Sequence, residues 1–214
     1  MTSLPPHKTR LFDENIVPIS RIQLNKRLKL LDEKDAADLL RIEGLLHWSQ
    51  MKNDIDQQFV KSTLASIESI DNQFIKDIVI WRLEVRIILA ALRIRQQGSK
   101  QAPAKKILGF DCWHYYISHY WNEPDFGLGK QCPWLVEANA FMLANQSLQL
   151  EKLLLKMVWE HYHRQNFGHY FNFEAVIIYV LRWDIVSRWY SNDKEVAVKR
   201  FNDLVDKGLQ KVDL

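Results

Sequence analysis

Apolar residues recur with helical spacing along this chain, and the clearest case is segment 72–97. One set of apolar residues is spaced alternately four and three residues apart, which places the set on one face of an α-helix. A second apolar set lies on the opposite face when successive residues are rotated by about 100° around the helix axis. Gly98 stands where a helix commonly ends. A helix with two apolar faces lies between two layers, so the pattern predicts a central helix. The two sets are Phe74, Ile78, Trp81, Val85, Ile88 and Leu92, and Ile75, Val79, Leu83, Ile87 and Ile94.

A second segment, 173–190, is apolar nearly all round, and Asn172 is placed to cap its first turn. Such a helix is predicted to lie at the centre of a domain. Its charged side chains must then reach solvent or find partners. Asp184 and Arg188 are four residues apart and can pair on one face.

Start and stop signals predict the other helices. Ser20 with Gln23 forms a capping box, Asp32 is a second cap, and the pattern breaks around 145–147. Residues 1–19 contain three prolines and are predicted to form an extended arm. The helix predicted from 133 to 145 begins with Pro133 at its first position, and the helix predicted from 147 to 166 is capped by Ser147. A last helix is predicted to begin at Asp193, and the aromatic segment 110–121 is predicted to be partly helical. The other predicted helices cover about 20–31, 33–49 and 56–69.

These elements predict an all-α fold, a multi-helix bundle with central buried helices at 72–97 and 173–190. The chain has 7 Gly and 6 Pro, too few for the many tight turns of a β-sandwich. The polar connector 98–108 divides it into two helical subdomains. We expect an N-terminal arm and subdomain at 1–98 and a C-terminal subdomain at 99–214, with one continuous domain as the alternative.

Charge and cysteine content restrict the class of partner. A net charge of +3 spread among acids does not form the basic stripe typical of nucleic-acid binding, so no nucleic acid is expected. No apolar run is long enough to cross a bilayer. The first residues lack the apolar region of a signal peptide, so Cys112 and Cys132 are expected to stay reduced in the cytoplasm.

No catalytic or nucleotide-binding motif is present, which predicts a protein that is not an enzyme and has no cofactor. The alternative is a metal-dependent helical enzyme. Glu160 with His163, and Asp111 with His114, have the E-x-x-H type of spacing that turns two ligands to one helix face. Large aromatics surround both pairs and no further carboxylate stands out, so no metal site is expected. The Asp-Phe-Gly at 125–127 lacks every other kinase motif.

Aromatic residues are numerous, with 8 Trp, 7 Tyr and 10 Phe. Trp121, Phe126 and Trp134 lie in or beside a loop that also carries Lys130. Aromatics with a basic residue on a loop are typical of a protein-binding hot spot, so these four residues are the predicted interface. The same pattern also fits a loop folded onto its own domain.

Several segments spread over most of the chain match one known family. They are Ser3–Pro6, Pro18–Ser20, Asp125–Gly129 with Pro133 and Trp134, Leu150–Leu154 with Trp159, Phe173–Tyr179, Arg188, Trp189 and Phe201. On these residues the sequence resembles a bacterial family of unknown function found beside V-type ATPase subunits. That family is itself similar to the C-type subunit of V/A-type ATPases, which is the d-type subunit in eukaryotes.

The resemblance implies a non-catalytic helical subunit or accessory protein that docks central-stalk components of a rotary ATPase to its membrane ring. Its partners would be stalk and ring subunits. It would be cytoplasmic and peripheral to the inner membrane through them. The chain is too short for the three helical subdomains of the C-type ATPase protein. A stand-alone helical adaptor is the remaining alternative.

Overall fold

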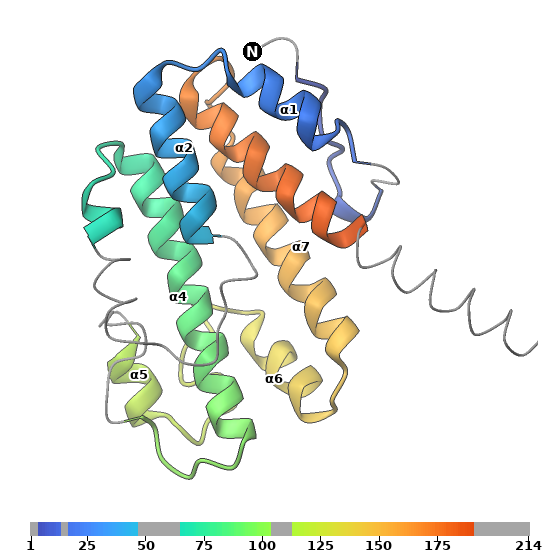
Figure 1. Ribbon diagram of the computed structural model, residues 1–214. Helices are drawn as coiled ribbons and strands as arrows, with labels where there is room; N and C mark the ends of the chain where they lie inside the picture. The colour runs from blue at the N-terminus through green and yellow to red at the C-terminus, as the bar shows by residue number, and fades with distance from the viewer. Residues whose placement is uncertain (1–3, 14–16, 47–64, 104–112, 191–214) are drawn as a thin grey trace, which may run out of the picture. The chain divides into compact units, whose positions relative to one another are not determined.

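The computed structural model describes residues 4–13, 17–46, 65–103 and 113–190, and every regular element in these ranges is helical. The predicted all-α fold is confirmed. The described chain forms two compact units. Unit 1 combines residues 1–30 with 159–214, and unit 2 comprises residues 31–158. Figure 1 shows the helices of these units coloured by residue number.

These units differ from the predicted division at residues 98 and 99. That division falls inside unit 2, where the indole of Trp121 donates a hydrogen bond to the carbonyl of Ser99 at 3.1 Å. The first 30 residues instead pack with the C-terminal part of the chain. The composition of a short segment, such as the polar connector at 98–108, does not reveal contacts between residues that are far apart in the sequence.

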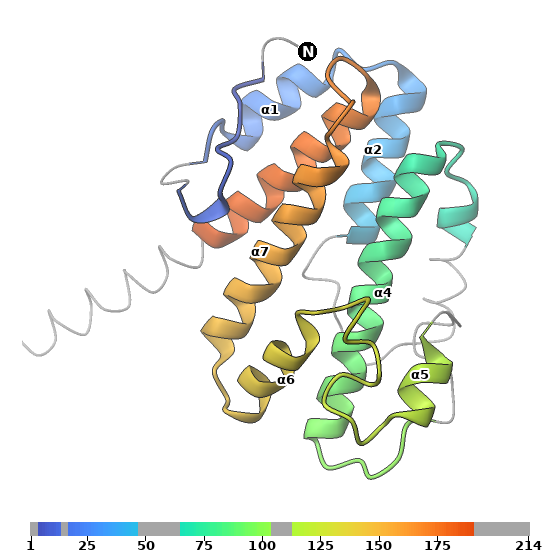
Figure 2. The same ribbon diagram turned by 180° about the vertical axis from the view of Figure 1, so that it is seen from behind.

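Unit 2 is built around α4 (Gln73–Gln96). As predicted, α4 buries both apolar sets, with Ile78, Ile88 and Leu92 from one and Ile75 and Val79 from the other. Figures 1 and 2 show α2 (Glu33–Leu46) alongside α4. The predicted cap of α2 is confirmed, since the Asp32 carboxylate accepts a hydrogen bond from the Asp35 backbone at 2.8 Å.

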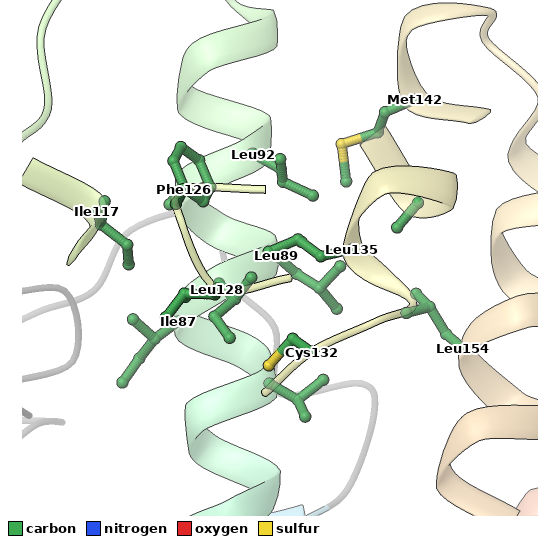
Figure 3. Close-up of a cluster of buried hydrophobic side chains, with 14 of the residues drawn as sticks. Ile87, Leu89, Leu92, Ile117, Phe126, Leu128, Cys132, Leu135, Met142 and Leu154 are labelled. Atoms are coloured by element: carbon green, nitrogen blue, oxygen red, sulfur yellow. The ribbon is translucent and has the colours of Figure 1, made fainter. Parts of the chain in front are cut away.

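The main core of unit 2 lies between α4, α6 (Leu135–Leu143), the loop before α6, and the start of α7 (Ser147–Gln165). Figure 3 shows Phe126, Leu128 and Cys132 of that loop directed toward α4. Ile117, from α5 (His114–His119), and Leu154, from α7, complete the cluster. The loop is therefore part of the core and not a surface feature.

Two helix ends in unit 2 share one backbone geometry. After α4, Gly98 has φ +94°, its N–H donates to Arg95, and the next N–H donates to Ile94. After α6, Asn145 has φ +53° and ends that helix with the same pair of bonds. This is the Schellman arrangement, and it confirms the predicted ends at Gly98 and near Asn145.

The start of α6 was predicted wrongly. Pro133 was expected at the first helical position, but α6 begins two residues later at Leu135, after a turn. In that turn the N–H of Cys132 donates to Leu128 and the N–H of Leu135 donates to Cys132. Ser147 is likewise the first residue of α7 and not the residue before it.

Unit 1 contains η1 (Leu11–Asp13), α1 (Arg21–Leu28), the end of α7 and the helix 173–190. The Ser20 hydroxyl accepts a bond from the Gln23 backbone, and the Asn172 side chain caps helix 173–190 by accepting from Ala175. Both predicted caps are confirmed. Figures 1 and 2 show α1 running alongside helix 173–190, the orange-red helix.

The predicted burial of helix 173–190 is also confirmed. Most of its apolar side chains are buried, and Trp183 packs with Ile19 and Leu24. Asp184 pairs with Arg21 of α1 at 3.7 Å. The predicted helix 56–69 is described only at 65–68, the aromatic segment 110–121 only from 113, and the last helix, from Asp193, lies outside the described residues.

Within the described part of the chain, no helix combines the length and the apolar character needed to cross a lipid bilayer.

Candidate docking surface

The predicted interface loop is folded onto its own unit. Trp121 is 5% exposed and Phe126 is fully buried, and their rings stack with centres 5.5 Å apart. Trp134 is half-buried, and only Lys130 has an exposed side chain. The sequence allowed either a protein-binding loop or a loop folded onto its own domain, and in the structure the loop packs on its own domain. Trp121 and Phe126 are buried in the core of unit 2.

One arginine of α4 holds this loop in place. The guanidinium of Arg95 lies 4.3 Å from the centre of the Phe126 ring. It donates hydrogen bonds to three parts of the loop backbone and to an amide of α6. These acceptors are the carbonyls of Trp121 (2.8 Å), Glu123 (2.5 Å) and Pro124 (3.2 Å), and Oδ1 of Asn139 (2.9 Å).

Burial lowers the pKa of Arg95, but a guanidinium remains charged throughout the ordinary pH range. Its planar fork can therefore bind several carbonyls at once. Arg95 therefore acts as the tether of the loop.

The Asp-Phe-Gly triplet forms a structural turn. Asp125 accepts a hydrogen bond from the Gly127 backbone at 3.0 Å, and Phe126 and Gly127 both have positive φ, +52° and +69°. A Cβ at Gly127 would meet the Tyr120 ring at 3.0 Å, and one at Gly129 would meet the Asp125 carboxylate. The glycines thus serve a turn that inserts Phe126 into the core.

The two pairs weighed as metal ligands, Glu160 with His163 and Asp111 with His114, are described only in part. Glu160 and His163 are exposed on α7, His114 lies on α5, and Asp111 lies outside the described residues. Among the described residues, no three His, Cys, Asp or Glu side chains gather as metal ligands would. Cys132 is a buried free thiol whose pKa is raised to about 11 by burial, and Cys112 is outside the described residues.

A different set of aromatics faces solvent. In the turn 166–172, between α7 and helix 173–190, Phe167 is 86% exposed, Tyr170 66% and Phe171 77%. Large apolar side chains this exposed, and this close together, are typical of an interaction site. We call these three residues the turn aromatics. The sequence carried a signal for them, because Gly168 and Asn172 mark a turn that contains no periodic apolar pattern.

The backbone of this turn is ordered by its own hydrogen bonds. Gly168 adopts φ +88°, which favours glycine. The N–H of Phe167 donates to Arg164, that of His169 donates to Asn166, and the Asn172 amide bonds to the His169 ring at 2.7 Å. A partner would therefore meet the turn aromatics on a fixed backbone, at a lower entropic cost of binding than on a loose loop.

A third cluster, also in unit 1, anchors the N-terminal arm. The indole of Trp159 donates to the carbonyl of Thr9 at 2.9 Å, and the guanidinium of Arg182 donates to the carbonyl of Lys8 at 2.9 Å. Nε2 of His7 lies 3.2 Å from the carbonyl of Tyr179. Side chains of two helices thus bind two consecutive carbonyls of the arm, those of Lys8 and Thr9.

The described residues define an all-helical protein whose aromatic residues include core anchors, such as Trp159 and Phe126, and three exposed side chains in the turn 166–172. The chain belongs to the family described as Protein of unknown function (DUF2764), which matches residues 23–211. No curated protein and no solved structure matches the chain.

Proposed function

We propose that this chain is a non-catalytic docking protein, that its turn aromatics are the contact surface, and that its partners are central-stalk and ring subunits of a V-type rotary ATPase. The observation that carries the docking role is the exposure of Phe167, Tyr170 and Phe171 on one ordered turn. The choice of partner rests on the sequence resemblance to a family found beside V-type ATPase subunits.

Aromatic residues supply much of the binding free energy at protein interfaces, since they bury large areas at a small cost in conformational entropy. Left in water, the same side chains are a solubility liability, which a dedicated partner would remove. A docking protein needs rigid units. In this chain, α4 and helix 173–190 each provide a long buried helix at the centre of a unit.

An affinity pull-down of the tagged chain from gently solubilised native membranes tests the proposal. The interface variant replaces all three turn aromatics by serine. The control variant replaces three exposed apolar residues of unit 2 by serine, namely Val136, Leu143 and Leu148. Both variants remove exposed apolar surface and leave the buried cores intact.

Enrichment of ATPase stalk or ring subunits by wild type and control, with at least a tenfold loss in the interface variant, is the expected result. A tenfold loss corresponds to about 1.4 kcal/mol, a modest demand on three aromatic contacts. Absence of ATPase subunits from the wild-type sample would overturn the choice of partner. Equal enrichment by all three proteins would overturn the assignment of the turn as the contact.

A further inference from the structure

The N-terminal arm of unit 1 is attached by packing and by side-chain hydrogen bonds: Leu4 packs on the cluster of Ile19, Leu24 and Trp183, and residues 7–9 make the hydrogen bonds described above. Pro5 and Pro6 have no backbone N–H to donate. The side chains of Lys8 and Thr9 are exposed, and these residues are anchored through the carbonyls that Arg182 and Trp159 bind. A short segment attached by a few hydrogen bonds and one partly buried apolar side chain can detach without disrupting the helices beneath it.

His7 is the titratable group at the centre of this attachment. Its ring centre lies 5.6 Å from that of Trp159 and 4.4 Å from that of Tyr179. The guanidinium of Arg182 is 3.9 Å from the centre of the same Trp159 ring. A protonated His7 would therefore bring a second positive charge into a cluster that already holds a buried arginine.

The groups around His7 come from three elements. Helix 173–190 contributes Arg182 and the Tyr179 carbonyl, and α7 contributes the uncharged Trp159 ring. On the arm itself, the Lys8 ammonium donates to the carbonyl of Asp13. Burial and the charge of Arg182 lower the pKa of His7 to about 4, and the Tyr179 carbonyl opposes them only in part.

We propose that residues 4–9 form an acid-sensitive clasp, in which protonation of His7 shifts the arm toward detachment and exposure of the Trp159 ring with Arg182. The neutral imidazole fits between the two aromatic rings, whereas the imidazolium is excluded by desolvation and by the neighbouring guanidinium. The clasp is independent of the docking function proposed above, because it involves none of the turn aromatics.

The strength of the effect follows from the two protonation equilibria. A detached His7 titrates with a pKa of about 6.5, while the docked ring titrates with a pKa of about 4. Between pH 7.5 and pH 5.5 the equilibrium constant for docking the arm is then expected to fall about tenfold.

Hydrogen exchange of the Trp159 indole N–H, followed by NMR on the full chain, tests the clasp. That N–H donates to Thr9 and can exchange only when the arm is detached. Its resonance is assigned with Trp159→Phe, and its rate is divided by that of free indole at the same pH. The Trp183 indole donates at 2.7 Å to the carbonyl of Ile19, which lies beyond the clasp residues 4–9, and it is the internal control.

The expected result is a fall of about tenfold in the protection of Trp159 between about pH 7.5 and 5.5, with less than about a twofold change for Trp183. In His7→Gln, the Trp159 value should change less than about twofold over the same range. His7→Phe, which keeps a ring in the same place, is the second non-titrating variant in case the glutamine variant does not fold.

Three results would overturn the clasp. Constant protection of Trp159 in the wild type would show that His7 does not control the arm. An equal fall in both non-titrating variants, or in whichever one folds, would assign the pH dependence to another group. A parallel fall at Trp183 would show that unit 1 opens as a whole.

Discussion

The guanidinium of Arg182 lies 3.9 Å from the centre of the Trp159 ring, and the two side chains donate to the neighbouring carbonyls of Lys8 and Thr9. The arginine is only 7% exposed, so its contact with the ring and the arm compensates part of the cost of burying its charge. The pair joins α7, helix 173–190 and the N-terminal arm at a single point of unit 1.

Removing the indole donor should weaken this junction measurably. Trp159→Phe leaves the carbonyl of Thr9 without its bond and is expected to lower the free energy of unfolding by about 1 kcal/mol. Trp159→Ala, which also removes a buried ring, should cost about 3–5 kcal/mol. Urea unfolding followed by circular dichroism measures both.

Trp113→Phe makes the same ring replacement at a half-buried site and is the comparison variant. The Trp113 indole nitrogen is buried and has no hydrogen-bond partner within the described residues, so its removal should change stability by less than about 0.5 kcal/mol. If the two phenylalanine variants lost equal stability, the loss would reflect ring size and not the bond to Thr9.

The stability of the protein should fall with acidification through His7. The folded-state pKa of about 4 is below the unfolded value of about 6.5, so the unfolded state binds more protons between these pH values. The contribution of neutral His7 is therefore complete above about pH 6.5 and is lost as pH falls toward 4. The full change is at most about 3 kcal/mol.

Urea unfolding of the wild type and His7→Gln at about pH 7.5, 6.5, 5.5 and 4.5 measures this contribution. The difference between the two proteins should shift in favour of the variant as pH falls, because carboxylate titrations are common to both and cancel. Parallel stability curves would show that His7 has the same pKa in both states.

Replacing Arg95, which tethers the loop in unit 2, by lysine should destabilise the protein although the charge is kept. Arg95→Lys replaces a planar fork bound to three carbonyls and an amide oxygen by a single ammonium. We expect a loss of about 2 kcal/mol in the free energy of unfolding, since several carbonyls lose their donor.

Arg93→Lys is the control for this change, because Arg93 is exposed and lies two residues away on the same helix. Its effect should stay within about 0.5 kcal/mol. A comparable loss of unfolding free energy in both variants would show that the hydrogen bonds of the Arg95 guanidinium are not the cause.

Two glycine substitutions should act in opposite directions. Gly127→Ala places a Cβ at φ +69° and 3.0 Å from the Tyr120 ring, so we expect a loss of about 1–2 kcal/mol. Gly44 lies within α2, and a methyl group added there would meet no atom within 4 Å, so Gly44→Ala should gain about 0.5–1 kcal/mol. Thermal unfolding of the two variants distinguishes them, and a stabilised Gly127→Ala would contradict the strained turn.

The long periodic helices were predictable because their sequence pattern is local. Segment 72–97 became α4 with both apolar faces buried, and segment 173–190 became the buried helix of unit 1. The caps at Ser20, Asp32 and Asn172 were equally local, since each depends on a side chain and an N–H a few residues away.

The candidate surface was less predictable, because an aromatic residue in a loop has the same sequence signature whether it is buried or exposed. Trp121 and Phe126 are held in the core by Arg95, which lies 26 residues before Trp121 in the chain. Phe167 and Phe171 remain exposed because their turn is closed by its own bonds. The grouping of His7 with Tyr179 depends on a contact between distant segments that no local pattern encodes.

The discontinuity of unit 1 has a consequence for biosynthesis. Its N-terminal segment, residues 1–30, packs with residues 159–214, so it has no native partner until the ribosome has added the whole of unit 2. At a synthesis rate of about 5–20 residues per second, the apolar side chains of Leu11, Ile19 and Leu24 remain without their native partners for on the order of ten seconds. Unit 2, whose contacts are closer in sequence, can fold during this interval. The segment 1–30 is therefore the part of unit 1 that stays exposed longest during synthesis, and chaperones that bind apolar segments would have the most time to bind it there.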